Sequence, residues 1–393
     1  MVLKTLLFLA AILALTLGAH LLFYKAVVRL FVINSPALKA MLLILLLLLS
    51  LSFMASFFLL RWQQTSITIG FYMFAASWTA LFLNLLLAAL LSWIIIAVIW
   101  LTGNYPNTRL IAAGCLMLAI LFTGYGVWNA FHPQIKILEI DLENLPDQWK
   151  GKTIVQLSDV HLGHFYGTRF LKDLVNRVNA LNPELILITG DLFDGMAGDI
   201  SHFAGGLSGF RANKGVYFVI GNHEIYVGLN RALGTLHKTN INVLKNEVID
   251  VGGLQIIGIS YPGIKGIGEI QGLEKIQSTS SKNNRPRILL FHTPTNISPQ
   301  EADGRQRHFA TYWVPDTTYT MARNLGVDLQ LSGHTHAGQF IPFGYLTKLI
   351  YKDFDYGLRR LKEFAIYTTS GVGTWGPPMR TGNQPEIVAI KLL

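Results

Sequence analysis

Acidic, amide and imidazole side chains recur in short clusters along the carboxyl-terminal two thirds of this sequence. In chain order the clusters are Asp159-Val-His161, Gly190-Asp191, Gly221-Asn222-His223-Glu224, His292 and Gly333-His334-Thr-His336. One such residue alone would be explained by a hydrogen bond or a turn. Five clusters in succession indicate a metal centre, because carboxylate oxygens and imidazole nitrogens suit divalent Mn, Fe or Zn.

The composition of the clusters favours a centre with two cations. Two divalent cations about 3.5–4 Å apart repel each other, so a shared carboxylate has to lie between them, and Asp191 is the natural candidate. Gly190, Gly221 and Gly333 stand beside candidate ligands, where a glycine allows a sharp turn and a close approach of the backbone. The single cysteine, Cys115, excludes an intrachain disulfide and a cysteine-based zinc site.

Each cluster directly follows a short apolar run, which is typical of a strand buried on both faces. The runs are Thr153–Leu157, Leu185–Ile188, Val216–Ile220, Ile288–Phe291 and Leu329–Leu331. Between the first two runs, apolar residues from Phe170 to Leu181 recur every three or four positions and predict a helix that Pro183 closes. This alternation predicts a layered α/β fold, in which the ends of adjacent strands converge on one crevice.

With these residues in place, the sequence resembles the calcineurin-like metallophosphoesterases from about Ile135 to Leu393. The resemblance implies a layered β-sandwich flanked by helices. It also implies hydrolysis of a phosphodiester or pyrophosphate bond by in-line attack of a metal-bound hydroxide. All five motifs of the family are present, with no ligand replaced.

The resemblance also implies a role for each residue of the motifs. One cation would be held by Asp159, His161, Asp191 and His336, and the other by Asp191, Asn222, His292 and His334. His223 would not be a ligand. It would stabilise the charge of the transition state and protonate the leaving oxygen.

A narrower resemblance connects the chain with the membrane-associated YkuE-like branch of this family. It rests on the runs Gly333–Pro342 and Thr369–Arg380. The branch includes a UDP-2,3-diacylglucosamine pyrophosphatase and the transmembrane protein with a metallophosphoesterase domain, which makes a lipid-linked nucleotide the implied substrate. Ala337 replaces the usual glycine of the branch. The segment Glu301–Tyr319 is longer than usual and would either cap the site, touch lipid or form a surface loop.

Several other polar residues carry weaker expectations. Arg380 is expected to bind a substrate phosphate, with an ion pair to Glu386 as the alternative. His164 would line the phosphate pocket or lie in a solvated loop, and residues 262–287 are expected to form an exposed loop. Structural or exposed positions are expected for His202, His237 and His308.

The amino-terminal third has a different composition. The whole chain is 51% apolar and 14% charged, against about 25% charged in soluble proteins. Residues 1–135 contain no Asp or Glu, and their six basic residues supply most of the net charge of +9. The positive charge therefore belongs to the flanks of membrane segments, and no nucleic-acid partner is expected.

Four apolar segments, at about residues 5–23, 41–60, 71–101 and 110–131, are long enough to cross a bilayer. The sequence thus predicts a transmembrane region over 1–131, a polar connector over 132–152 with an extended stretch at 135–140, and a catalytic domain over 153–393. A cleaved signal peptide is the alternative for the first segment. The flanking charges are balanced, so the side of the membrane on which the catalytic domain lies stays open.

These observations lead to one main functional hypothesis and two alternatives. The main one is a membrane-anchored phosphoesterase of the bacterial inner membrane, with two divalent cations and a phosphorylated or lipid-nucleotide substrate. The alternatives are a phosphoprotein phosphatase and a non-catalytic membrane sensor. The sensor has no need for His223, and the apolar segments lack the acidic residues of ion pathways. The oligomeric state stays open.

Overall fold

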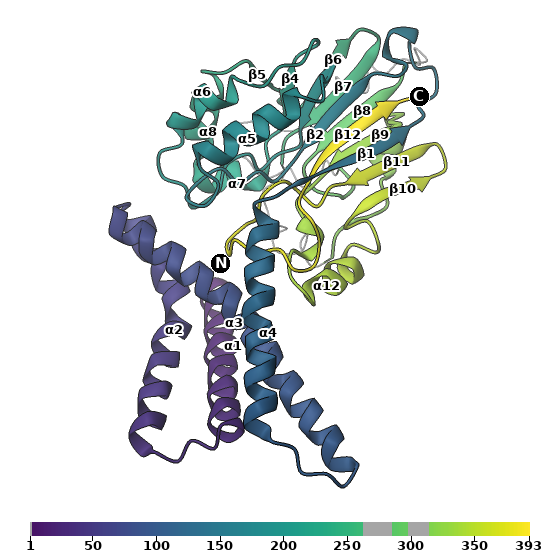
Figure 1. The fold of residues 1–393 in the computed structure, drawn as a ribbon. Coiled ribbons are helices and arrows are strands. Elements are labelled where there is room, and N and C mark those ends of the chain that lie inside the picture. The colour runs from purple at the N-terminus through teal and green to yellow at the C-terminus, as the bar shows by residue number, and fades with distance from the viewer. Residues whose placement is uncertain (1, 262–284, 298–313) are drawn as a thin grey trace. The chain divides into compact units, whose positions relative to one another are not determined.

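A computed structural model of the chain describes residues 2–261, 285–297 and 314–393 (Figure 1). The chain forms two compact units, which are considered one at a time. The first contains residues 1–128 and 376–379, and the second contains residues 129–375 and 380–393. Most of the loop expected at 262–287, most of the segment 301–319 and His308 lie outside the described residues.

The first unit contains four long apolar helices. They are α1 (Val2–Leu30), α2 (Pro36–Trp62), α3 (Ser66–Leu101) and α4 (Thr108–Ala130). Each is long and apolar enough to cross a membrane, which confirms the four expected apolar helices. The start of α2 is fixed by Ser35, whose hydroxyl accepts the N–H of Leu38, and Thr65 and Thr68 cap α3 in the same way.

The second unit contains two mixed six-stranded sheets. The strand order of the first is β1-β12-β2-β3-β4-β5, and that of the second is β10-β11-β9-β8-β7-β6. The strands of the first sheet are β1 (Gln134–Ile140), β2 (Thr153–Leu157), β3 (Leu185–Ile188), β4 (Val216–Phe218), β5 (Ile241–Val243) and β12 (Glu386–Leu392). Those of the second are β6 (Glu247–Val251), β7 (Leu254–Ile259), β8 (Arg287–Phe291), β9 (Leu329–Ser332), β10 (Gly357–Leu361) and β11 (Phe364–Thr368).

Short helices connect these strands. They are α5 (Thr168–Asn179), α6 (Ala204–Leu207), α7 (Asn222–Val227), α8 (Leu229–Leu236), α11 (Thr320–Asn324) and α12 (Phe343–Ile350), with short 3₁₀ turns at 147–149, 201–203 and 336–338. The helix expected between the first two apolar runs is α5. The extended stretch expected in the connector is β1, which pairs in parallel with β12 at one edge of the first sheet.

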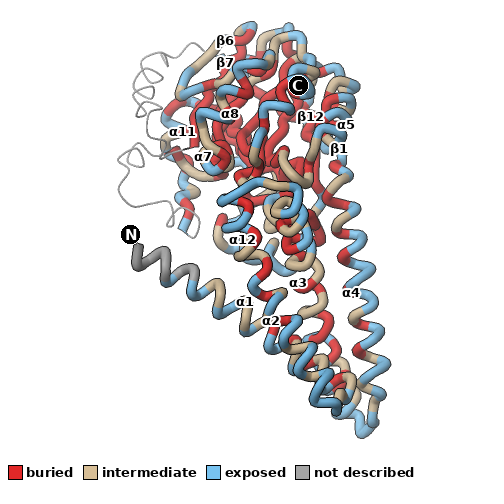
Figure 2. The backbone as a smooth tube through the Cα atoms, turned by 90° about the vertical axis from the view of Figure 1, so that its left-hand side faces the viewer, coloured by how far each residue is buried: buried red, intermediate tan, exposed pale blue. Residues whose placement is uncertain are grey.

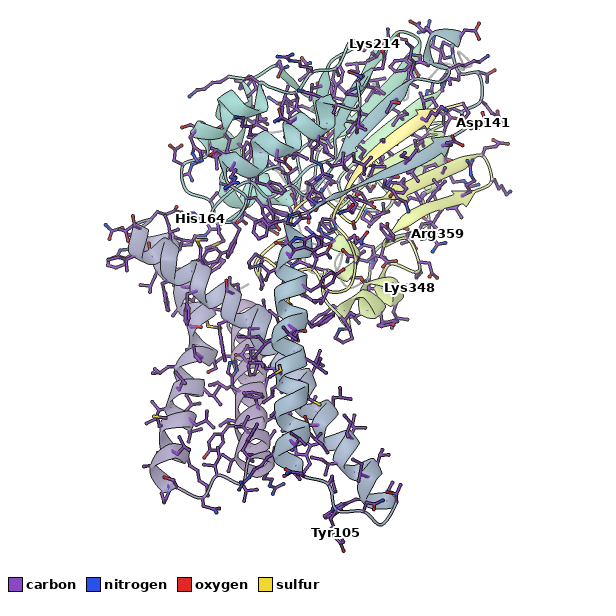
Figure 3. The ribbon with its side chains drawn as sticks, in the orientation of Figure 1. Tyr105, Asp141, His164, Lys214, Lys348 and Arg359 are labelled. Atoms are coloured by element: carbon purple, nitrogen blue, oxygen red, sulfur yellow. The ribbon has the colours of Figure 1, made fainter. Side chains whose placement is uncertain are left out.

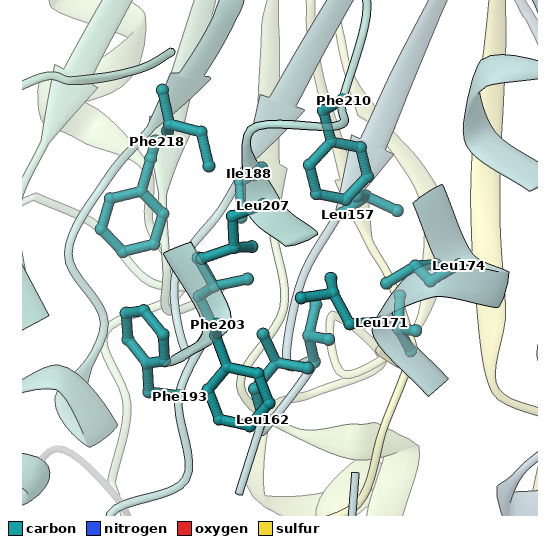
Figure 4. Close-up of a cluster of buried hydrophobic side chains, with 14 of the residues drawn as sticks. Leu157, Leu162, Leu171, Leu174, Ile188, Phe193, Phe203, Leu207, Phe210 and Phe218 are labelled. Carbon is teal, nitrogen blue, oxygen red and sulfur yellow. The ribbon is translucent and has the colours of Figure 1, made fainter. Parts of the chain in front are cut away.

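Alternate residues of the strands enter different layers of the core. Along β3, Leu185 and Leu187 pack between the two sheets, whereas Ile186 and Ile188 pack against the helices on the outer face. Figure 4 shows this outer cluster, with Leu171 and Leu174 of α5 facing Leu157 and Ile188. A third cluster, around Leu289 and Tyr319, lies on the other face of the second sheet. The middle of the domain is accordingly buried (Figure 2).

This arrangement confirms the predicted fold class, a layered α/β sandwich flanked by helices. The pattern has a simple physical cause. Exposing either face of a strand that is apolar on both faces to water is unfavourable. Such a strand therefore lies between the other sheet on one side and helices on the other. The polar clusters that follow these strands are then held at the rim of a rigid scaffold.

Candidate metal centre

The candidate ligands lie in the tight turns that follow the strands, and several have an uncommon backbone conformation. Asp159, His161, Asp191, His334 and His336 have φ angles of 52°, 53°, 52°, 74° and 50°. Such left-handed residues cost about 1–3 kcal/mol each and persist only where the surrounding structure holds them. Their concentration here indicates that the fold imposes the positions of these side chains.

One group of ligands combines Asp159, His161 and His336, all of them buried. The Nε2 atoms of His161 and His336 are 3.1 Å apart. The Oδ1 atom of Asp159 lies 3.3 Å from Nε2 of His336 and 3.9 Å from Nε2 of His161. The carboxylate of Asp159 also accepts the backbone N–H of His334 at 3.0 Å, which fixes its orientation. Three donor atoms therefore converge on one point.

The second group contains Asp191, His292, His334 and Asn222. Nε2 of His292 lies 3.0 Å from Oδ2 of Asp191 and 3.1 Å from Oδ1 of Asn222. Nδ1 of His334 lies 3.0 Å from the same amide oxygen and 3.2 Å from Nε2 of His292. All seven predicted ligands thus fall into two groups, and Asp191 interacts electrostatically with His161 of the first group as well as with His292.

The charges of the centre are strongly coupled. Burial opposes the ionisation of Asp191, but the nearby histidines, His292 foremost, outweigh it and hold the pKa of Asp191 below its ordinary value. Burial also opposes a charge on His292, yet the Asp191 carboxylate raises the pKa of His292 to about 9. Burial and the charge of His292 lower the pKa of His334 to about 3. The carboxylates of the centre thus favour a positive charge beside them. Without a metal, the proton on His292 provides this charge.

Two glycines allow the donor atoms to come this close. A side chain at Gly221 would collide with the carboxylate of Asp191, and one at Gly333 would collide with Asp159 and Ser158. Both contacts are with atoms that the site holds rigidly, so neither position accepts a larger residue without moving a ligand. This supports the role predicted for the glycines of the motifs.

His223 lies beside the first group, with its ring 4.4 Å from that of His161. Its Nδ1 lies 3.0 Å from the backbone nitrogen of Gly195 and 3.7 Å from Oδ1 of Asp194. Burial opposes a charge on this ring, but the carboxylates of Asp191 and Asp194 outweigh it and raise the pKa of His223. The raised pKa favours the ring protonated on both nitrogens, which can donate its Nε2 proton and become neutral.

Asp194 and Glu224 were not predicted as functional residues from the sequence. Asp194 follows Asp191 by three positions, and this spacing is the signal that could have identified it. Glu224 is fully buried, and its carboxylate accepts the N–H groups of Asp191, Gly221, Leu192 and Phe193 at 2.8–3.2 Å. It thereby joins the turn that carries Asp191 to the one that carries Asn222.

The expectation that Arg380 binds a substrate phosphate is wrong for this structure, because its side chain is fully buried. The guanidinium donates to the carbonyl oxygens of Ser370 and Gly373, and its Nη2 lies 3.0 Å from Nδ1 of His336. The alternative partner, Glu386, accepts the hydroxyl groups of Tyr367 and Thr369. Arg380 therefore braces a metal ligand instead of contacting the substrate.

Three further histidines that the structure describes, His164, His202 and His237, do not belong to either group of ligands. His164, labelled in Figure 3, is half-buried, and its Nε2 lies 3.2 Å from the carbonyl oxygen of Met196. The exposed ring of His202 is tilted by 39° against the buried ring of Phe203, and His237 is exposed at the end of α8.

The donor atoms suit metal cations. The carboxylate and amide oxygens of the two groups accept and do not donate, and the imidazole nitrogens facing them offer lone pairs when neutral. Nδ1 of His161 is buried and has no hydrogen-bond partner among the described residues. Oxygen and imidazole donors without thiolates suit borderline divalent cations. The fold and the site therefore define a metal-dependent hydrolase domain.

Comparisons with known proteins agree with this class. The family model described as calcineurin-like phosphoesterase matches residues 152–338. An uncharacterized metallophosphoesterase of Campylobacter jejuni is 32% identical, over 70% of this chain and 68% of that protein. The transmembrane protein with metallophosphoesterase domain of Danio rerio is 31% identical, over 74% of this chain and 64% of that protein. YkuE of Bacillus subtilis, also an uncharacterized metallophosphoesterase, is 27% identical over 72% and 93% of the two chains.

This chain belongs to the calcineurin-like metallophosphoesterase family. It is a metal-dependent phosphoesterase, and its four long apolar helices make it a membrane protein.

Proposed function

We propose that this protein is a membrane-anchored phosphodiesterase or pyrophosphatase of the bacterial inner membrane, with two divalent cations and a lipid-linked substrate. A nucleotide-linked lipid such as UDP-2,3-diacylglucosamine is the specific candidate, through the resemblance to the YkuE-like branch. Relatives in Campylobacter jejuni and Bacillus subtilis support a bacterial setting.

The observation that carries the lipid part is the way in which the end of a membrane segment joins the catalytic domain. Asn129 and Ala130, the last residues of α4, belong to the second unit. Nδ2 of Asn129 donates to the carbonyl oxygens of Arg380 and Asn383 at 3.0 and 2.9 Å. The hydroxyl of Tyr166 donates to the carbonyl oxygen of Ala130 at 3.1 Å. The last two residues of α4 are therefore bonded to the catalytic domain.

The same loop leads directly to the metal centre. Nδ2 of Asn383 donates to the carbonyl oxygens of His336 and Ala337 at 2.8 and 3.1 Å, and Arg380 contacts the ring of His336. Only two residues, Asn383 and Arg380, separate the end of the span from a metal ligand. This continuity between a membrane segment and the loop beside a metal ligand supports a lipid-linked substrate.

The chemistry proposed for the centre follows from its residues. Asp159, His161, Asp191 and His336 would hold one cation, and Asp191, Asn222, His292 and His334 the other. These cations would supply Lewis acidity, which lowers the pKa of water and neutralises phosphate charge. In the reaction a water molecule would lose one proton to the solvent, and its oxygen would bond to phosphorus as the bond to the leaving oxygen breaks. His223, protonated on both ring nitrogens, would give its Nε2 proton to the leaving oxygen, and the Asp194 carboxylate, 3.7 Å from Nδ1, would favour that charged form of the ring.

Two other functions remain as outcomes of the test. A phosphoprotein phosphatase would use the same centre on a peptide substrate. A sensor that binds phosphate without turnover would need the cations but not the proton donor. The position of His223, beside the first group and with Nδ1 3.7 Å from the Asp194 carboxylate, favours turnover.

The experiment is a paired assay of detergent-purified full-length protein with Mn²⁺. Wild type, Asp191→Asn and the matched control Asp173→Asn, an exposed residue of α5, would receive bis(p-nitrophenyl) phosphate, UDP-2,3-diacylglucosamine and a phosphopeptide. The expected result is conversion of the lipid nucleotide to UMP and a lipid phosphate, lost in Asp191→Asn and kept in Asp173→Asn. Turnover of the phosphopeptide alone would overturn the lipid part, and metal binding without any turnover would establish the sensor.

A further inference from the structure

Among the helices of the catalytic domain that the structure describes, α12 is the exception that has no buried residue. Its apolar side chains are exposed instead, with Tyr345 at 78% and Leu349 at 77%. Phe343 and Leu346 are exposed as well, and Ile341 extends the same apolar character just before the helix. A water-soluble domain normally covers a cluster of this kind.

The apolar residues of α12 lie on one side of the helix. At 100° per residue, Phe343, Tyr345, Leu346, Leu349 and Ile350 fall within an arc of about 160°. The other side holds Gly344 and Thr347, whose hydroxyl lies within 3.2 Å of the carbonyl oxygens of Phe343 and Gly344. A short amphipathic helix with an exposed aromatic and aliphatic side is typical of segments that lie in the plane of a membrane interface.

The exposed charges around α12 are mainly basic. From α12 through β10 the chain contains Lys348, Lys352, Arg359 and Arg360, all exposed, against the acidic residues Asp353 and Asp355. Asp355 is buried, and Asp353 lies 3.2 Å from Nζ of Lys348. Lys348 on α12 and Arg359 on β10 are labelled in Figure 3. Lys and Arg side chains beside an apolar surface favour contact with anionic lipid headgroups.

Contacts within the second unit also connect α12 with the end of the membrane span. The backbone N–H of Ile341 donates to the hydroxyl of Thr381 at 3.3 Å, and the N–H of Thr381 donates to the carbonyl oxygen of Gln339 at 3.1 Å. Thr381 follows Arg380, whose carbonyl oxygen accepts the side chain of Asn129. The residues that lead into α12 are therefore fixed to the loop that holds the last turn of α4.

We propose that the apolar side of α12, together with Ile341, lies in the interface of a bilayer that contains anionic lipid. The basic residues from Lys348 to Arg360 contact the headgroups. Gly338, Gln339 and Phe340 alone separate Ala337 from this surface, and Ala337 is adjacent to the ligand His336. Contact with the bilayer would thus hold the metal centre at the headgroup layer. This contact does not depend on the substrate or on turnover.

The test uses single-cysteine variants of the full-length protein in a Cys115→Ala background, reconstituted into vesicles. Leu349→Cys on α12 and the control Lys172→Cys, exposed on α5, would each carry an environment-sensitive fluorophore. The vesicles would contain phosphatidylcholine, alone or with phosphatidylglycerol, and a lipid with a nitroxide near the headgroup. At position 349 the nitroxide should quench the emission about twofold or more, and more strongly in anionic vesicles, whereas position 172 should be unaffected.

Each other outcome overturns the proposal or a stated part of it. Emission at 349 as insensitive to the nitroxide as emission at 172 would place α12 in water. A blue shift at 349 without quenching would show that protein, such as a second copy of the chain, covers this surface. Equal quenching in neutral and anionic vesicles would contradict the proposed contact between the basic residues and the anionic headgroups. Since fluorescence is read without substrate, a failure here is distinct from a failure of the proposed activity.

Discussion

The two units of this protein differ in the residues that they expose. In the four long helices many large apolar side chains are exposed, for example Leu48 and Ile94, while small or polar ones such as Ala76, Ser56 and Ser92 are fully buried. In the catalytic domain large apolar residues such as Leu187 are fully buried. Lipid tails are as apolar as leucine, so helices in a membrane pack through small residues, whereas water drives large apolar residues into the core.

The comparison indicates that the long helices are adapted to lipid and the catalytic domain to water. Helix α12 departs from this division. This helix belongs to the unit with a water-type core but exposes apolar residues as the membrane helices do. Exposed apolar side chains are expected to face lipid on α3. By the same argument we propose that those of α12 face the membrane interface. Chemistry, by contrast, belongs to the domain alone, where all the acidic residues of the chain are found.

The largest expected effect comes from His223→Ala, which removes the proton donor but none of the ligands. Turnover of a diester should fall by about 10²–10⁴-fold, the usual contribution of a general acid. The metal content, measured by mass spectrometry, should stay at the wild-type value. The exposed His237→Ala on the same domain serves as the control and should keep full activity. Unchanged turnover in His223→Ala would contradict its assigned role.

Replacing one leucine by alanine in each unit compares the stability that a leucine contributes in the catalytic domain with the stability that it contributes on a membrane helix. Leu187→Ala leaves a cavity between the two sheets and should lower the free energy of unfolding by about 2–5 kcal/mol. Leu48→Ala changes a side chain that faces outward and should cost less than about 1 kcal/mol in a bilayer-like detergent. Thermal unfolding of the two variants measures the difference. Equal losses would mean that the apolar surface of α2 packs against protein.

The pKa values of the centre predict how metal binding depends on pH. Without metal, His292 has a pKa of about 9 and carries a proton at pH 7. A cation has to displace that proton, so the apparent affinity should rise about tenfold per pH unit from 7 to 9 and level off above. Titration with Mn²⁺ measures the slope. In His292→Asn the slope should disappear, while an affinity independent of pH in the wild type would contradict the assignment.

Much of the fold, and the clustering of the candidate ligands, could be predicted from the sequence because the signals are local. The run Leu185–Ile188 is apolar at every position, which is typical of a strand covered on both faces, and Asp191 follows it after two residues. The strand order places such ends together. Motif spacing could therefore name Asp159, His292 and His336 before any distance was known.

Features that depend on partners distant in sequence could not be predicted in the same way. The role expected for Arg380 was wrong because its burial depends on the carbonyl oxygens of Ser370 and Gly373 and on His336. The bond between Asn129 and the Arg380–Asn383 loop joins residues 251 positions apart. The exposure of α12 could not be predicted from the sequence either, because an amphipathic pattern does not show whether the apolar side of a helix is covered.

The central claim is that one buried centre binds two divalent cations through two groups that share Asp191. Its most direct test is the metal content of the full-length protein, purified in detergent with Mn²⁺ and measured by mass spectrometry. Wild type and Asp173→Asn should each contain about two cations per chain, and His336→Ala and His292→Ala should each lose one of them. A wild type that binds a single cation, or one whose metal content survives both substitutions, would contradict the account.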